Sequence, residues 1–129
     1  MKRVIENGIT HFNNQECSME NISLDIILPV YNEADQIEVI IKKYDQIFKK
    51  KLGNSFRIIV CEDGSVDGTK DILVKLPIIL NTSIKRKGYS KAIMDGLKLT
   101  QASLVALSDS DGQIDPEDLL KLYSYLILK

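Results

Sequence analysis

The chain has 129 residues, enough for one domain of ordinary size, and its 44% hydrophobic and 27% charged content is typical of a globular protein. Its formal net charge of −1 argues against broad nucleic-acid binding, which depends on neutralising many phosphates. We therefore expect no nucleic-acid partner.

The expected elements alternate between strands and helices in chain order. Residues 1–21 are polar and show no period, so we expect a leader that is partly ordered at best, followed by one domain over residues 22–129. Strands are expected at 24–30, 56–61, 78–80 and 103–107, and helices at 34–50, 69–76, 90–99 and from 116 onward. This alternation predicts an α/β fold with a mainly parallel open sheet and helices on both faces.

The periodicity also predicts which helix faces point inward. Residues 34–50 place apolar side chains at steps of three and four. In the helix at 90–99, Ile93 and Leu97 are expected inward, with Met94 as a further candidate. Asp115 is expected to cap the last helix, with Pro116 in its first turn.

The expected location is the cytoplasm. No apolar stretch approaches the roughly 18 residues that span a bilayer, and residues 1–21 lack the apolar block of a signal peptide. Cys17 lies in the polar leader and Cys61 at the end of an apolar run, so a disulfide between them is not expected. This cysteine usage indicates a reducing compartment.

The most informative segment is Ser108-Asp109-Ser110-Asp111-Gly112, which directly follows the apolar residues 104–107. A strand that ends in Asp-x-Asp projects two carboxylates from the carboxyl edge of a sheet, where open α/β sheets bind ligands. Carboxylate oxygens suit Mg²⁺ or Mn²⁺, which commonly bridge a protein to a diphosphate. The alternative is that both aspartates only cap and turn the chain. Against it, two like charges this close need a cation or solvent to compensate them.

A second acidic turn, residues 62–69, follows the second expected strand. Gly64 and Gly68 permit left-handed backbone or close ligand approach, and Asp63 is placed to accept hydrogen bonds from a nucleobase. The spacing also fits the start of an EF-hand calcium loop. Val74 stands where that loop requires a bidentate Glu, which excludes it.

Two further segments carry less specific signals. Residues 29–33 end the first expected strand and open a helix whose N-terminus favours anions; alternatively, Asn32 caps that helix and Tyr31 packs on the sheet edge. Residues 86–91 form a basic, glycine-containing loop before the next helix. This loop suits a diphosphate, and a solvated basic loop is an equal alternative.

The aspartate pair also fits the haloacid dehalogenase type of phosphatase, whose nucleophilic Asp-x-Asp follows a buried strand. In that type a Thr usually follows the Gly and the motif opens the domain, whereas here Gln113 stands in that place, late in the chain. The single histidine, His11, lies in the leader, so neither a Ser-His-Asp triad nor a histidine-rich metal site is available.

Taken together and in this order, the four segments resemble the family 2 glycosyltransferases of the GT-A fold. The closest likeness is to the dolichyl-phosphate mannose synthase and polyprenyl-phosphate sugar transferase branch, over residues 27–33, 60–69, 86–96 and 108–119. The resemblance implies inverting, metal-dependent transfer from a UDP- or GDP-sugar to an acceptor such as a polyprenyl phosphate. Mg²⁺ or Mn²⁺ would stabilise charge on the departing nucleoside diphosphate. A lipid acceptor would place the full protein peripherally at the inner membrane face.

The resemblance also implies roles for individual residues. Pro29, Tyr31 and Glu33 would line the pocket for the base and ribose. Asp63 would read the base edge, and the 86–91 loop would approach the nucleotide. Asp109 contacts ribose or metal, and Asp111 ligates the metal, with Gln113 as a further ligand. The implied nucleotide-binding residues are Pro29, Tyr31, Glu33, Asp63, Gly64, Arg86, Gly88, Lys91, Asp109 and Ser110, and the implied metal ligands are Asp109, Asp111 and Gln113.

The chain is short for a complete catalytic domain of this family, which continues beyond these elements. We expect a fold truncated after its fourth strand and following helix, carrying the donor-nucleotide half, with no assignable catalytic base. Such a half-sheet exposes an apolar edge that favours self-association or a partner chain. The alternative reading is a non-catalytic nucleotide-binding or assembly module, or an inactive truncated glycosyltransferase.

Overall fold

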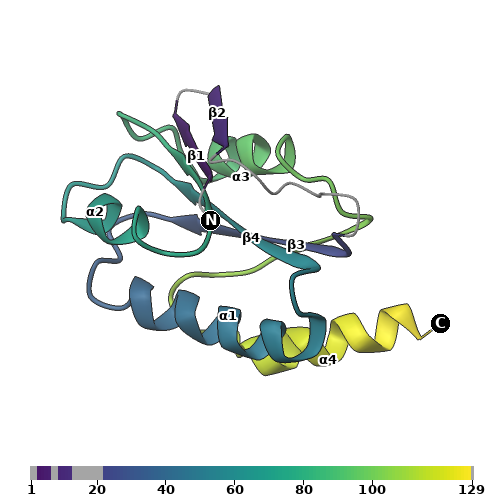
Figure 1. Cartoon of the computed structure of the whole chain (residues 1–129). Helices are drawn as coiled ribbons and strands as arrows, with labels where there is room; N and C mark the ends of the chain where they lie inside the picture. Colours follow the sequence, from purple (N-terminus) through teal and green to yellow (C-terminus); the bar gives the residue numbers. More distant parts are fainter. Residues whose placement is uncertain (1–2, 7–8, 13–21, 129) are drawn as a thin grey trace.

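Among the residues that the structure describes, six strands form a single sheet in the order β2-β1-β5-β4-β3-β6 (Figure 1). The computed structural model describes residues 3–6, 9–12 and 22–128. Four parallel strands make up the centre and one edge: β3 (Leu24–Val30), β4 (Phe56–Glu62), β5 (Ile79–Thr82) and β6 (Leu104–Leu107). These match the four expected strands closely, and the prediction of a mainly parallel open sheet is confirmed.

The other two strands lie within residues 1–21, where the sequence pattern predicted no strand. β1 (Arg3–Glu6) pairs in parallel with β5, and β2 (Ile9–Phe12) pairs antiparallel with β1. Each has four residues, too few to display an apolar alternation against a polar background. The domain boundary expected at residue 22 remains a prediction.

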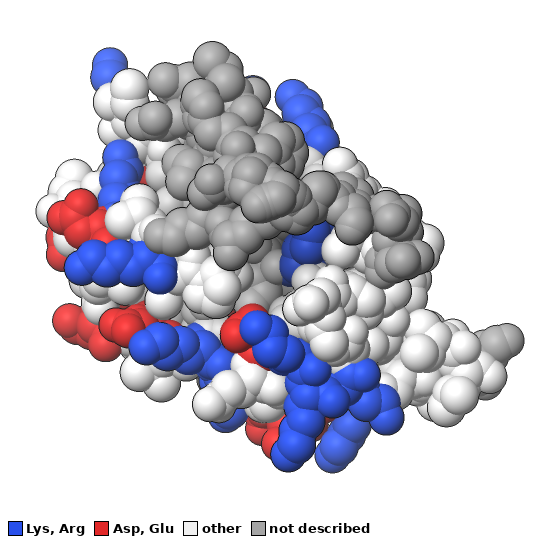
Figure 2. Space-filling view, in the orientation of Figure 1, with Lys and Arg blue, Asp and Glu red and all other residues white. Residues whose placement is uncertain are grey.

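Helices cover both faces of the sheet. α1 (Ile37–Leu52), α2 (Thr69–Leu73) and α4 (Pro116–Ile127) lie on one face and α3 (Tyr89–Leu97) on the other (Figure 1). All of β4 and nearly all of β3 is buried, which explains their continuous apolar sequences. The larger core contains the inward side chains of α1, namely Ile37, Ile41, Tyr44 and Phe48. The opposite face of α1 carries exposed lysines, and Figure 2 shows basic side chains gathered over this helix.

The boundaries of two helices test the sequence signals. α1 begins at Ile37, three residues after the expected start, because residues 34–36 form a turn. At α4 the expected cap is confirmed: the Asp115 carboxylate accepts a 3.0 Å hydrogen bond from the Glu117 amide, and Pro116 is the first helical residue.

The expected inward face of α3 was wrong for Leu97 and Met94, whereas Ile93 is half-buried. Ala92 and Gly96 are buried against β3 and β4, whereas Met94 and Leu97 are 55% and 45% exposed. A Cβ on Gly96 would lie 2.5 Å from the Cys61 sulfur, so only a residue without a side chain fits there. Close packing through small residues therefore determines which face of α3 meets the sheet, rather than the position of its large apolar side chains.

A buried ion pair ties the amino end of the sheet together. Arg57 of β4 donates to both oxygens of Asp25 in β3, at 2.7 and 2.9 Å. The Asp25 carboxylate also accepts from the backbone amides of Gln101 and Ala102, which lead into β6. This explains the one charged residue in the β3 run: its carboxylate is fully satisfied and joins three strands.

Candidate functional site

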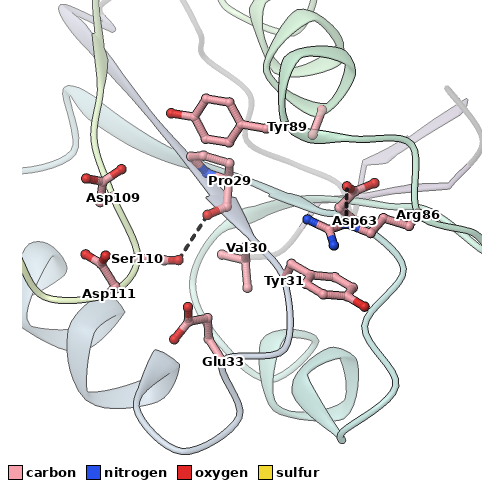
Figure 3. Close-up of a pocket in the computed structure, with 11 residues that line it drawn as sticks. Pro29, Val30, Tyr31, Glu33, Asp63, Arg86, Tyr89, Asp109, Ser110 and Asp111 are labelled. Carbon is pink, nitrogen blue, oxygen red and sulfur yellow. Dashed lines mark hydrogen bonds and ion pairs between the residues drawn. The ribbon is translucent and has the colours of Figure 1, made fainter.

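The topology creates a crevice between two neighbouring strand ends. From β3 the chain proceeds to β4 and β5 on one side, then returns to add β6 on the other side of β3. Ligands of open α/β sheets bind where the strand order reverses in this way, outside the carboxyl ends. A cavity of about 270 Å³ lies at this point, lined by Pro29, Val30, Tyr31, Glu33, Asp63, Arg86, Tyr89, Ala92, Asp109, Ser110 and Asp111 (Figure 3).

The acidic turn after β6 forms one wall of the cavity. Ser108 and Ser110 are 2% and 6% exposed, and Asp109, Ser110 and Asp111 line the cavity. The Ser108 amide donates to the Ile27 carbonyl at 3.0 Å, and the Ser110 hydroxyl donates to the Pro29 carbonyl at 3.0 Å. Alternation of anchored serines with cavity-facing aspartates places both carboxylates on the same wall.

The carboxylate oxygens on this wall suit a hard divalent cation whose remaining ligands come from a bound substrate and water. Asp109 and Asp111 supply carboxylate oxygens, and one Asp111 oxygen also accepts from the Gln113 amide at 3.1 Å. Among the residues that the structure describes, no group of three or more His, Cys, Asp or Glu side chains is arranged to hold a metal. Mg²⁺-type ions are commonly held by one or two carboxylates together with substrate phosphates and water, and two aspartates fit that pattern.

Opposite the acidic turn, the loops after β3 and β4 are hydrogen-bonded to each other. The Asn32 amide donates to the Ser65 hydroxyl at 2.8 Å, and the Asn32 side-chain oxygen accepts from the Val66 amide at 2.9 Å. Asn32 adopts a positive φ of 51° and does not cap α1. The alternative in which Asn32 caps that helix was therefore wrong; its side chain joins the two loops.

Two more hydrogen bonds strengthen this junction. Thr69 Oγ1 accepts from the Glu33 amide at 3.0 Å, and the Asp67 carboxylate accepts from the Ala34 amide at 3.2 Å. Hydrogen bonds from Thr69, above all from its hydroxyl, and from the Ala34 amide lower the pKa of Asp67. Asp67 therefore stays ionised at neutral pH and holds the loop that carries Tyr31.

Asp63 holds the third loop of the site. Its two carboxylate oxygens accept from the backbone amides of Lys87 and Gly88, at 2.7 and 2.9 Å, and the side chain is almost fully buried. Gly64, with a φ of +77°, backs onto this loop, and a Cβ there would lie 2.7 Å from the Arg86 nitrogen. The close approach expected at Gly64 is thus made to the protein backbone.

Arg86 closes the side of the cavity opposite the aspartates. Its guanidinium carbon lies 3.9 Å from the centre of the Tyr31 ring, and its Nε lies 3.7 Å from an Asp63 oxygen. Figure 3 shows this group across the cavity from Asp109 and Asp111, with Pro29 and Val30 between them. One wall is therefore acidic, and the other presents a cation stacked on an aromatic ring.

Most of the site residues proposed from the sequence come together here, but four do not line the cavity. Gly88 precedes α3 and supports the loop through Asp63, whereas Lys91 is exposed on the first turn of α3. Gln113 is exposed, and its backbone rather than its side chain contacts Asp111. Gly64, described above, is the fourth. Tyr89 was missed, although an aromatic residue directly after a basic glycine loop was a usable signal.

The chemistry of Cys61 is separate from this site. The thiol is buried between the sheet and α3, and burial raises its pKa to about 12. It is therefore a protonated packing group at neutral pH.

The mainly parallel sheet has its cavity at the strand-order reversal, between an acidic turn after β6 and a basic loop before α3, as expected for the α/β fold that the resemblance to GT-A glycosyltransferases implies. A family model, Glycosyl transferase family 2, matches residues 25–127. The chain belongs to this family.

Two curated relatives give the extent of the similarity. The chain is 29% identical over 105 residues to a dolichol-phosphate mannosyltransferase of Pyrococcus furiosus, covering 78% of this chain and 29% of the relative. It is 28% identical over 116 residues to an undecaprenyl-phosphate 4-deoxy-4-formamido-L-arabinose transferase of Pectobacterium atrosepticum, covering 83% and 34%. The chain therefore spans about a third of the length of these relatives.

Solved structures share the fold. A mannosyltransferase from Pyrobaculum calidifontis, in complex with GDP-Man and Mn²⁺, matches with a TM-score of 0.56 and 24% identity, over 68% of this chain and 27% of that one. The glucosyl-3-phosphoglycerate synthase from Mycobacterium tuberculosis, in complex with Mn²⁺, UDP and glucosyl-3-phosphoglycerate, matches with a TM-score of 0.66 and 20% identity, over 90% and 46%. Both likenesses support the GT-A assignment of the fold.

Proposed function

We propose that this chain carries the donor-nucleotide half of a metal-dependent glycosyltransferase that uses a UDP- or GDP-sugar. The observation that carries the proposal is the cavity at the strand-order reversal, with two aspartates on one wall and the Arg86–Tyr31 stack on the other. A nucleoside diphosphate has a flat base at one end and a charged diphosphate at the other. The two walls complement those two ends.

The base would lie at the Tyr31 wall and the diphosphate at the aspartate wall. An aromatic ring and a guanidinium plane both stack favourably on nucleobases. Asp63 retains lone pairs beyond the two that accept backbone amides, so it would also accept from a base edge. Pro29 and Glu33 line the space between the walls, where the ribose would lie.

Asp109 and Asp111 would hold Mg²⁺ or Mn²⁺ against the diphosphate, which supplies Lewis-acid stabilisation of the charge on the leaving group. Ser110 would keep the two carboxylates facing the cavity through its bond to the Pro29 carbonyl. We propose inverting transfer: the acceptor oxygen bonds to the anomeric carbon as the bond from that carbon to the diphosphate oxygen breaks. The base that removes the acceptor proton is not assigned to any residue of this chain.

The acceptor is proposed from the relatives, which are named for dolichol phosphate and undecaprenyl phosphate. A polyprenyl phosphate acceptor would bring the whole protein to the cytoplasmic face of a membrane as a peripheral protein. Among the described residues, every helix is too short or too polar to cross a bilayer.

Nucleotide titration tests the proposal. UDP and GDP would be titrated calorimetrically, each with and without Mn²⁺, into the wild type, Asp111→Asn and the control Asp118→Asn, an exposed carboxylate on α4. We expect Mn²⁺ to strengthen the binding of one nucleotide, and Asp111→Asn to weaken the metal-dependent binding by at least about tenfold. Asp118→Asn should bind as the wild type does. Equal binding by Asp111→Asn and the wild type would contradict the proposal.

The same protein samples separate an enzyme from a binding module. Release of free nucleotide from UDP-glucose or GDP-mannose in the presence of Mn²⁺ would show turnover by the chain alone. Metal-dependent binding without such release would favour a nucleotide-binding or assembly module.

A further inference from the structure

A buried tyrosine on α1 contacts the start of the acidic turn. The Tyr44 hydroxyl lies 2.5 Å from the Ser108 hydroxyl, although the two residues are 64 positions apart in the chain. Tyr44 is fully buried and Ser108 is 2% exposed, so this hydrogen bond is shielded from water. Ser108 directly precedes Asp109, the first of the two cavity-facing aspartates.

The packing of α1 alone does not account for a tyrosine at this position. The other buried side chains of α1 are Ile37, Ile41 and Phe48, all of them apolar. The Tyr44 ring stacks on Phe48 with centroids 6.3 Å apart, a contact that a phenylalanine would also make. A hydroxyl buried in an apolar core is unfavourable unless it is hydrogen-bonded, and here its partner is Ser108.

We propose that Tyr44 is a positioning residue for the metal-binding turn, acting through Ser108; the consequence for metal binding rests on the proposed function. Two serine anchors flank Asp109. Ser108 is tied to α1 through Tyr44, and Ser110 is tied to the end of β3 through the Pro29 carbonyl. With both anchors in place the intervening aspartate has a defined direction toward the cavity. Without the Tyr44–Ser108 hydrogen bond, the segment that leaves β6 is held by two hydrogen bonds, from the Ser108 amide to the Ile27 carbonyl and from the Ser110 hydroxyl to the Pro29 carbonyl.

A second tyrosine–serine pair provides a matched control. Tyr123 of α4 is 6% exposed, and its hydroxyl donates to the Ser23 hydroxyl at 3.1 Å at the opposite end of the sheet. Tyr123→Phe removes a hydroxyl from the same core but leaves the acidic turn untouched. A role in stability alone predicts similar behaviour for Tyr44→Phe and Tyr123→Phe.

Hydrogen exchange tests the anchor without any ligand. In the full chain we expect amides of residues 108–113 to exchange about threefold or more faster in Tyr44→Phe and in Ser108→Ala, with no change there in Tyr123→Phe. Unchanged exchange of these amides in a folded Tyr44→Phe variant would overturn the proposal. Because the exchange experiment uses no ligand, it tests the positioning role even if the wild type binds no nucleotide. Failure of the wild type to bind nucleotide would contradict the proposed function and not the role of Tyr44.

Nucleotide titration tests the consequence. Tyr44→Phe is expected to lower the Mn²⁺-dependent gain in nucleotide affinity by about tenfold while leaving the affinity without metal unchanged. Tyr123→Phe should retain the full gain. An equal metal-dependent gain in both variants would also overturn the proposed positioning role.

Discussion

At the scale of single residues, the site depends on carboxylates that hold backbone amides as much as on those that face the cavity. Asp63 and Asp67 each accept backbone N–H groups from a neighbouring loop, and together they join three loops around the cavity. Asp109 and Asp111 remain on the cavity wall. Similar side chains in one acidic site thus divide between holding the loops and facing the cavity.

Replacing Asp63 by Asn tests the loop-holding role. Asn keeps the shape but has one acceptor oxygen, and its NH₂ group would face a backbone N–H donor. We expect a loss of about 1–3 kcal/mol in the free energy of unfolding, measured by urea denaturation. Asp71→Asn, at an exposed position on α2, should change it little. Equal stability of the two variants would contradict the role.

The lowered pKa of Asp67 predicts a dependence of stability on pH. Because its pKa in the folded state lies below the ordinary 3.8, its contribution is fully present above that value and is lost as pH falls through the folded pKa. Wild type should melt at a higher temperature than Asp67→Asn at pH 7, and the difference should shrink below pH of about 4. A difference in melting temperature that stays constant down to pH 3 would count against this linkage.

At the scale of elements, close packing of α3 on β3 and β4 sets the geometry of the basic loop. Gly88 precedes α3, and the buried face of the helix consists of Ala92 and Gly96. Because no large side chain separates helix from sheet, the N-terminus of α3 is held beside the cavity, where Tyr89 lines it.

Gly96→Ala tests this packing. The added methyl would lie 2.5 Å from the Cys61 sulfur, so helix or strand must shift, and we expect a net loss of about 1–3 kcal/mol in unfolding free energy despite the better helix propensity of Ala. The double variant Gly96→Ala, Cys61→Ala makes room for the methyl and should recover part of the loss. Met94→Ala, at an exposed position on the same helix, is the control. If Gly96→Ala were as stable as the wild type, the packing of position 96 against Cys61 would not be tight.

The same elements show what the sequence could and could not predict. The strand ends and the acidic turn were predictable because apolar runs followed by Asp or Gly mark buried strands and their loops. The buried face of α3 was not predictable, because apolar periodicity identifies large side chains such as Met94 and Leu97 as inward-facing and gives no signal at Gly96. The Tyr44–Ser108 bond and the junction at Asn32 join residues far apart in the chain, and no local pattern encodes such pairs.

At the scale of the whole molecule, β6 is an edge strand among the described residues, and its outer residues are apolar. Val105 and Leu107 are 41% and 48% exposed, and Leu126 and Leu128 of the α4 end are 51% and 84% exposed. Apolar surface on an unpaired strand favours association with another chain.

Light scattering tests whether this exposed apolar surface causes the chain to associate. We expect the isolated chain to form dimers or larger species, and Val105→Lys with Leu107→Lys to shift it toward monomer, because charged edge strands resist pairing. Val39→Lys, at an exposed position on α1, should leave the association unchanged. A monodisperse wild-type monomer with cooperative melting would contradict the expectation.

The central claim is that the acidic turn after β6 binds a divalent ion together with a nucleoside diphosphate. The most direct measurement is paramagnetic broadening of backbone amide NMR signals by substoichiometric Mn²⁺, with saturating UDP in one sample and GDP in another. With the nucleotide that binds, we predict selective loss of the signals of residues 109–112, then of residues 30–33 across the crevice. Broadening centred on another acidic segment, such as Glu117 and Asp118 on α4, or none in a folded chain with either nucleotide, would contradict the claim.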